Sequence, residues 1–135
     1  MKIIGNLLSK KGFFISTMIN KFCISEFMYF ALKGKIKTAT RRWYKNPIQI
    51  TLKSNLPKIW CNFYTPREYF NLTKDDFHHI ETIGLPIIMF SENFGNANYY
   101  SDEVLQKIIK VEKKIAGLSP FNNFGDHYIS VLQKR

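Results

Sequence analysis

The pattern of hydrophobic and polar residues has a helical period at the start of the chain and a strand period further on. Residues 6–11 form a short basic amphipathic segment, which predicts one or two helical turns. In SEFMYFALK the apolar residues recur at helical spacing behind Ser25, a favourable N-cap residue, and Gly34 stands where this helix would end. In IQITLK, residues 48–53, apolar and polar residues alternate one by one, and KIWCNFY, residues 58–64, is also typical of a strand. The first half is therefore predicted to begin with helices and to end with two strands.

The second half predicts strands separated by short helices. In chain order we expect an extended segment at 67–70, a short helix at 72–80, a buried strand at 85–90, a helix at 101–117 and a strand at 127–132. Thr73 and Ser101 can cap the two helices, and acidic residues follow each of them in the first turn, where the helix dipole favours negative charge. This order predicts an α+β fold, with a basic, helix-rich N-terminal α/β domain over residues 1–58 and a small β-rich domain with short helices over residues 59–135.

The positive charge is concentrated in the first half of the chain. The protein has 135 residues, of which 45% are hydrophobic and 16% aromatic, and its net charge is +10. Residues 1–67 hold 13 lysines and arginines and one acid, Glu26, whereas residues 68–135 hold 7 lysines and arginines and 9 acids. A strongly basic half favours a polyanionic partner, either nucleic acid or an anionic membrane face, because released counterions favour association. A solvated basic surface without a partner is the alternative.

The cysteines and the N-terminal segment indicate a reduced protein that does not span a membrane. Cys23 and Cys61 are too few and too far apart for a metal site or a disulfide framework, so we expect packed, reduced thiols in an intracellular compartment. Lysines and Glu26 interrupt the apolar residues of the first 33 positions, which leaves no run of the roughly 18–20 residues that a transmembrane helix needs. We expect no cleaved leader and no stable membrane insertion.

The sequence contains no recognisable catalytic motif. A phosphate-binding loop would end in Gly-Lys-Ser or Gly-Lys-Thr, and the small residues of a hydrolase elbow are missing around Ser91. His78 and His79, with Asp75 and Glu81 nearby, could be read as a metal cluster, but adjacent side chains on a helix diverge by about 100°. We therefore expect no catalytic residue, no metal, no cofactor and no small-molecule substrate.

Several segments of the second half occur in an order found in one known family. YTPREYF, with Pro66, stands where that family has a Ser-Arg-Pro-Gly turn, and KDDFHHI is similar to its Lys-Asp-Glu-Leu segment. GLPIIMFSENFG matches its Gly-Leu-Gly, apolar strand and Ser-Thr-Ser-Lys-Gly loop at Gly84, Leu85, Ser91 and Gly95. SDEV and FGDHYISV are similar to the start of its Thr-Asp-Arg-Glu-Ala helix and to its closing strand. By this order, nearly continuous from about residue 46 to 104, the chain resembles the small-subunit ribosomal protein S-eight family.

The chain departs from the family pattern at two places. Glu92, Asn93 and Phe94 replace the Thr, Ser and Lys of the family's loop, and about a dozen residues are inserted before the last strand. These changes, with a composition rich in Lys, Asn, Ile, Phe and Tyr, suggest a diverged member from an AT-rich organellar genome. We expect a mitochondrial ribosome in preference to a plastid one.

The resemblance implies a structural constituent of the small ribosomal subunit. Such a protein binds the central domain of the small-subunit rRNA, supports its assembly beside neighbouring ribosomal proteins, and catalyses nothing. The charge distribution favours the lysines and arginines from Lys10 to Lys45 in the RNA-binding set as phosphate contacts. The resemblance implies a loop contact at residues 91–95, with Pro66 and Arg67 nearby. The full set is Lys10, Lys11, Lys35, Lys37, Arg41, Arg42, Lys45, Pro66, Arg67, Ser91, Asn93 and Gly95.

Two other functions stay open at this point. One is a peripheral accessory subunit of an organellar inner-membrane complex, with the Met1–Lys33 segment as an interfacial helix. The other is an enzyme with a site at Asp75, His78 and His79.

Overall fold

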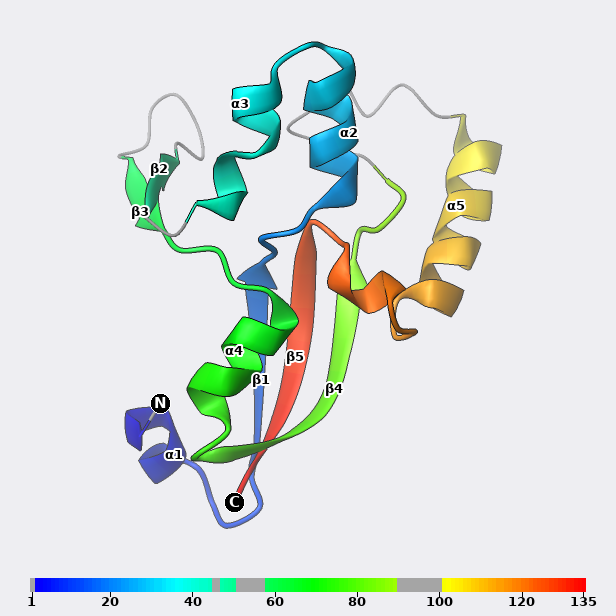
Figure 1. The fold of residues 1–135 in the computed structure, drawn as a ribbon. Helices are drawn as coiled ribbons and strands as arrows, with labels where there is room; N and C mark the ends of the chain where they lie inside the picture. The colour runs from blue at the N-terminus through cyan, green and yellow to red at the C-terminus, as the bar shows by residue number, and fades with distance from the viewer. Residues whose placement is uncertain (1, 45–46, 51–57, 90–100) are drawn as a thin grey trace.

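A three-stranded antiparallel sheet forms the centre of the computed structural model, which describes residues 2–44, 47–50, 58–89 and 101–135. The strand order is β1 (Phe13–Ile19), β5 (His127–Lys134) and β4 (Phe77–Leu85), so the C-terminal strand lies between the other two (Figure 1). Helices and sheet together make the α+β fold that the sequence predicts.

The helices and a second, two-stranded antiparallel sheet lie around this centre. α4 lies across one face of the three-stranded sheet, α2 and α3 lie beyond one end of it, and α5 lies beside β4 (Figure 1). The remaining elements are α1 (Lys2–Leu7), α2 (Ile24–Leu32), α3 (Ile36–Ala39), η1 (Arg41–Trp43), β2 (Ile48–Ile50), β3 (Ile59–Cys61), α4 (Pro66–Thr73), α5 (Asp102–Ile115) and η4 (Phe121–Asn123).

The core lies between α4 and the face of the sheet that α4 covers. Tyr69 from α4 packs against Phe77, Tyr128 and Leu132, and the last three side chains are fully buried. The Tyr69 hydroxyl also lies 2.9 Å from the Ser16 hydroxyl on β1. Because side chains alternate along a strand, every second residue of β5 points into this core.

Among the described helices, α2, α4 and α5 begin at side-chain caps. Ser101 caps α5, as predicted, by accepting a hydrogen bond from the Val104 N–H. The cap of α2 is Cys23 and not the predicted Ser25, because the Cys23 sulfur accepts from the Glu26 N–H at 3.4 Å. Gly34 has a φ of 70° just beyond α2, which is the conformation that glycine supplies at helix ends.

The predicted extended segment at 67–70 and helix at 72–80 are wrong. A capping box starts α4 at Pro66: the Thr65 hydroxyl accepts from the Glu68 N–H, and the Glu68 carboxylate accepts from the Thr65 N–H. Thr73 ends this helix, and its hydroxyl donates back to Tyr69 O and Phe70 O instead of capping a new helix. The residues after it join the sheet as β4, in register with β5.

The strand predicted at 85–90 is wrong for residues 86–89, since only Leu85 belongs to a strand. β4 ends at Leu85, where Pro86 follows, and proline has no N–H to donate to a strand partner. The N–H groups of residues 87–89 instead all donate to the buried Glu112 carboxylate on α5, at 2.5–3.0 Å. Phe90 lies outside the described residues.

The first 33 residues contain a strand that the sequence analysis missed. β1 pairs along its whole length with β5, and the helix before it covers Lys2–Leu7 instead of the predicted 6–11. A continuous interfacial helix over residues 1–33 is therefore wrong. The pairing also joins the two predicted domains, since β1 lies in residues 1–58 and β5 in residues 59–135. Within the described part of the chain, no helix is both long enough and apolar enough to cross a bilayer.

Candidate nucleic-acid interface

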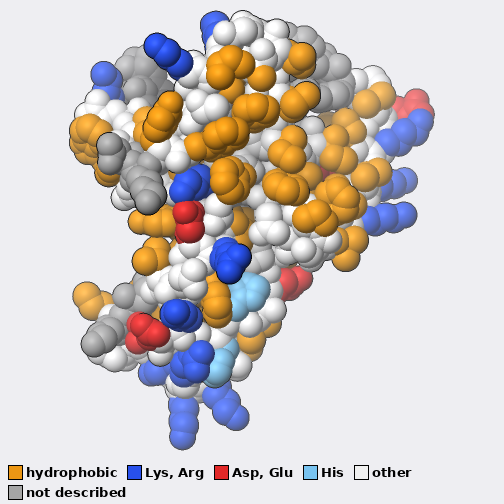
Figure 2. Space-filling model, in the orientation of Figure 1, with side chains coloured by type: hydrophobic (Ala, Val, Ile, Leu, Met, Phe, Trp, Pro, Cys, Tyr) orange, Lys and Arg blue, Asp and Glu red, His pale blue; other side chains and the backbone are white. Residues whose placement is uncertain are grey.

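One group of exposed cations lies at the turn between α2 and α3. Lys35 and Lys37, both predicted to bind RNA, are exposed there, and so is Lys33. From residue 27 to residue 67 the sequence contains nine lysines and arginines and no acid. Figure 2 shows lysine and arginine side chains at the upper end of the molecule, near these helices, and again at the lower end. A phosphate that approaches α2 and α3 therefore meets no nearby carboxylate from this stretch of chain.

Exposed aromatic rings stand among these cations. Trp43 is 43% exposed and stacks on Phe27 with ring centroids 5.3 Å apart, which fixes the orientation of its indole. Tyr44 and Trp60 are 61% and 68% exposed. Lys33 places its ammonium 4.0 Å from the Tyr29 ring centroid. Lysines and arginines with exposed aromatic faces are what single-stranded nucleic acid binds, through phosphates and through stacked bases.

A second group of cations lies at the opposite end of the sheet. Lys10 and Lys11 occupy the turn between α1 and β1, and both are exposed. The fold brings the C-terminus to this turn: Lys134 donates to Leu8 O at 2.9 Å, and Gln133 donates to Lys11 O at 3.2 Å. Lys134 and Arg135 therefore extend the predicted Lys10 and Lys11 group. Sequence reasoning missed them because they lie more than 100 positions away.

Arg42 is committed to the protein interior, contrary to its predicted role. It is 8% exposed, and its guanidinium forms ion pairs with Glu26 and with Asp126, the latter at 2.7 Å. It also donates to Asn20 O at 3.1 Å. Arg41 bonds Glu26 at 2.9 Å, but its side chain is 41% exposed and its charge reaches the surface. Arg42 therefore holds α2, η1 and the start of β5 together and is left out of the RNA-binding set.

Charged groups around Arg42 shift the pKa values of their neighbours. Burial alone would raise the pKa of Asp126, but a hydrogen bond from His127 and the Arg42 guanidinium lower it to about 2. Burial raises the pKa of the nearby Cys23 thiol. Ligand atoms of Cys23, Glu26 and Asp126 lie within 4.8 Å of one another. Arg42 is bonded to both carboxylates of this trio and supplies their counter-charge, so we assign the cluster a structural role.

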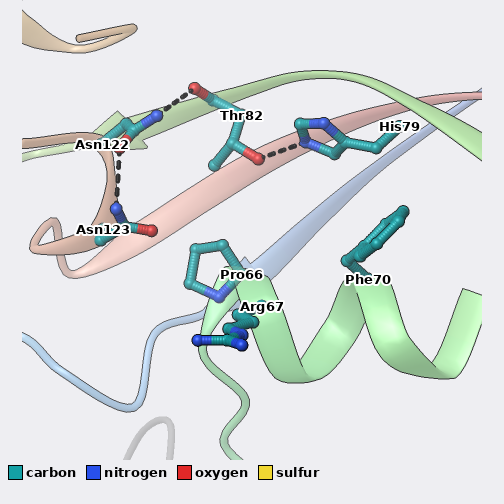
Figure 3. A pocket seen from close by; sticks show the side chains of 7 residues that line it. All are labelled: Pro66, Arg67, Phe70, His79, Thr82, Asn122 and Asn123. Carbon is teal, nitrogen blue, oxygen red and sulfur yellow. Dashed lines mark hydrogen bonds between the residues drawn. The ribbon is translucent and has the colours of Figure 1, made fainter. Parts of the chain in front are cut away.

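A pocket of about 270 Å³ lies between α4 and the β4–η4 edge of the sheet. Figure 3 shows Pro66, Arg67 and Phe70 from α4 on one side, and His79, Thr82, Asn122 and Asn123 on the other. Two of these residues, Pro66 and Arg67, belong to the RNA-binding set that the resemblance implies. Sequence reasoning missed the others, because the fold brings η4 to β4 over about 40 residues of intervening chain.

Hydrogen bonds fix the polar side of this pocket. Asn122 donates to Thr82 O at 3.4 Å, and Asn123 donates to the Asn122 side-chain oxygen at 3.0 Å. The His79 Nε2 lies 2.7 Å from the Thr82 hydroxyl, and its ring meets the Phe70 ring edge to face at 5.9 Å. A Cβ on Gly84 would lie 2.9 Å from Asn122 O, so a glycine is needed for η4 to approach the strand this closely.

The two adjacent histidines do not form one cluster. Both lie on β4 and not on the predicted helix, and successive strand residues point to opposite faces. His79 faces α4 and the pocket, and His78 is exposed on the other face. Within the described residues, the candidate metal group includes neither histidine.

Four predicted contact residues, Lys45, Ser91, Asn93 and Gly95, lie outside the described residues. Comparison of the chain with models of known protein families found no match, and neither did comparison with curated proteins. The S-eight resemblance and the role of the 91–95 loop stay predictions.

Proposed function

We propose that this protein binds RNA as a structural constituent of a small ribosomal subunit, in an organellar and specifically a mitochondrial ribosome. One observation carries the proposal: the surface formed by α2, α3, η1 and β3 combines exposed lysines with exposed aromatic rings and contains no carboxylate from residues 27–67. The order of segments that resembles the ribosomal S-eight family supports the more specific part of the proposal. The protein acts by holding RNA in place, without catalysis.

The lysines of α2 and α3 supply the salt-sensitive part of the binding. Each phosphate that a lysine neutralises releases counterions, and the logarithm of the affinity falls with the logarithm of salt by roughly 0.9 per duplex contact and 0.7 per single-strand contact. Lys33, Lys35 and Lys37 should together account for about 2–3 units of that slope if each contacts one phosphate.

The aromatic rings supply the part of the binding that salt affects least. Trp43 and Trp60 present faces on which unpaired bases can stack, each worth about 1–3 kcal/mol. The Lys10, Lys11, Lys134 and Arg135 group lies at the far end of the sheet, so a single RNA that touches both cation groups must be long or folded. A structured rRNA domain fits this requirement better than a short oligonucleotide.

The exposed apolar side chains of α2 suit the protein neighbours that the proposal includes. Ile24, Met28 and Leu32 are exposed along this helix, and Figure 2 shows hydrophobic side chains over the same half of the molecule. Clustered exposed apolar side chains are typical of protein contact sites. We place neighbouring ribosomal proteins on this side.

The test measures binding of a central-domain fragment of the organelle's small-subunit rRNA over a range of salt concentrations. A Lys33→Ala, Lys35→Ala and Lys37→Ala variant should bind more weakly, with a salt slope lower by about 2–3. The matched control changes Lys110, Lys113 and Lys114 on α5 to alanine, since these lysines are equally exposed but lie on a helix that also carries acids. Equal effects of the two triple variants on affinity and slope would contradict the assignment of the surface.

Sedimentation of organelle extracts tests the ribosomal part of the proposal. The protein should move with the small-subunit rRNA in a gradient and leave that position after ribonuclease treatment. Sedimentation with a membrane fraction that ribonuclease does not change would oppose it.

A further inference from the structure

The pocket between α4 and the β4–η4 edge has the features of a binding site for one nucleobase (Figure 3). We infer that it takes a single unpaired base of the bound RNA. The inference rests on the proposed function, which makes RNA the ligand.

The size and walls of the pocket suit a flat ring. Its volume of about 270 Å³ lies just below the roughly 300–1,000 Å³ of sites for drug-sized ligands, so it holds one base with part of its ribose and not two stacked bases. The ring of Pro66 and the side chain of Phe70 form its apolar wall on α4. Unpaired bases in RNA complexes are held between such apolar or aromatic side chains and arginine guanidinium planes.

Two asparagine amides face this wall. The Asn123 side-chain oxygen accepts no hydrogen bond from any described residue, and each amide nitrogen uses one of its two hydrogens in the bonds given above. Amide groups can pair with the edge of a base, because they offer a donor and an acceptor side by side. The pocket therefore offers hydrogen bonds that can specify a base, in addition to an apolar surface.

The amides are held in place before any base arrives. The backbone carbonyl of Asn123 accepts from the buried Asn20 side chain at 2.7 Å, which fixes the main chain at this residue, and the Asn122 side-chain amide donates to the Thr82 carbonyl on β4. Side chains that are already ordered lose little further conformational entropy on binding. Arg67 has no ion-pair partner among the described residues and is exposed at the start of α4, which leaves its charge for the phosphate of the same nucleotide.

Among the residues that the structure describes, no carboxylate lines the pocket to oppose a nucleotide. Its seven lining residues include no acid, but two acids adjoin them in sequence. Glu68, next to Arg67, pairs with Lys21 at 2.7 Å and accepts from the Thr65 N–H at 2.8 Å. Burial alone would raise the pKa of Glu68, but the Lys21 ammonium and the hydrogen bonds from Thr65 lower it. Glu81, next to Thr82, lies against Gly117, where an added Cβ would be 3.5 Å from its Oε1. The pocket thus presents one cation, one imidazole, two amides and an apolar wall.

Titration of the folded protein with the four ribonucleoside 5′-monophosphates tests the pocket without any RNA. When the titration is followed by NMR, at least one nucleotide should shift the side-chain amide signals of Asn122 and Asn123. The shifts should saturate, with a dissociation constant in the millimolar range. Asn123→Ala should weaken that binding about five- to tenfold, and Phe70→Leu should weaken it while keeping the wall apolar. Asn71→Ala is the matched control, because Asn71 is exposed on α4 and does not line this pocket. If none of the four nucleotides shifts these signals, the inference is wrong.

Binding of the rRNA fragment separates failure of this inference from failure of the proposed function. Asn123→Ala and Phe70→Leu should lower affinity with an unchanged salt slope, whereas the triple lysine variant on α2 and α3 lowers the slope. Binding of rRNA that depends on the lysines but not on Asn123 or Phe70 would overturn the base pocket and leave the proposed function in place. Mononucleotide binding by a protein that does not bind rRNA would keep the pocket and overturn the ribosomal role.

Discussion

Replacing Arg42 by methionine should strongly destabilise the protein. Methionine has a similar length but no charge, so the variant leaves Glu26 and Asp126, which are 1% and 3% exposed, without the guanidinium that now bonds both. Breaking a buried ion pair by removing one partner costs about 3–5 kcal/mol, because a buried charge is left uncompensated. A domain of this size has about 5–15 kcal/mol of stability in total, so the loss is a large fraction of it.

The assay is urea unfolding followed by circular dichroism, with thermal unfolding beside it. For a chain of this length each kcal/mol corresponds to roughly 3–5 °C, so the unfolding midpoint should fall by about 10–20 °C. Arg41→Met is the matched control, since Arg41 bonds the same Glu26 carboxylate from a position that is 41% exposed. It should cost no more than about 1 kcal/mol, because solvent screens an exposed charge. Adding Asp126→Asn to Arg42→Met should cost less than the two single changes together.

The opposite result would refute this reasoning. Suppose that Arg42→Met unfolds within about 1 kcal/mol of the parent protein but binds rRNA more weakly and with a lower salt slope. Arg42 would then face the RNA, as the charge distribution along the sequence suggested, and its assignment to a buried ion-pair cluster with Glu26 and Asp126 would be wrong.

Three further predictions concern stability and can be measured by the same unfolding assays. The pKa of Asp126 is about 2 in the folded protein, against its ordinary value of 3.8. The ionised carboxylate should therefore add about 2 kcal/mol to the free energy of unfolding above pH 4, and this stabilisation should be lost as the pH falls toward 2. Urea unfolding at several pH values will measure the loss. Gly84→Ala should cost about 1–3 kcal/mol through the clash with η4. Its matched control is Gly5→Ala in α1, where a Cβ meets nothing within 4 Å, and this change should cost nothing or stabilise the protein by up to about 1 kcal/mol. Glu112→Ala should cost about 2–4 kcal/mol because the N–H groups of residues 87–89 lose their acceptor, whereas Glu112→Gln keeps one acceptor oxygen and should cost less.

Elements with a local cause were predictable from the sequence. α5 follows from Ser101, the acids after it and the helical spacing of its apolar residues, all of which act within one or two turns. α4 has an equally local signal in Thr65-Pro66-Arg67-Glu68, the capping box, which could have been read and was not. β1 and β4 have no such signal, because they are stabilised by pairing with β5, at the far end of the chain from β1.

The candidate site divides in the same way. The sequence alone determined the excess of cations before residue 68, the absence of acids from residue 27 to 67, and the aromatic residues among them, because charge and ring content do not depend on folding. Only the tertiary structure decided which cations are available: it buries Arg42 between Glu26 and Asp126, and it adds Lys134 and Arg135 to Lys10 and Lys11. The base pocket is likewise a product of folding, since its two walls come from α4 and from η4. The physical reason is that burial and proximity arise from contacts between distant segments, which no local pattern contains.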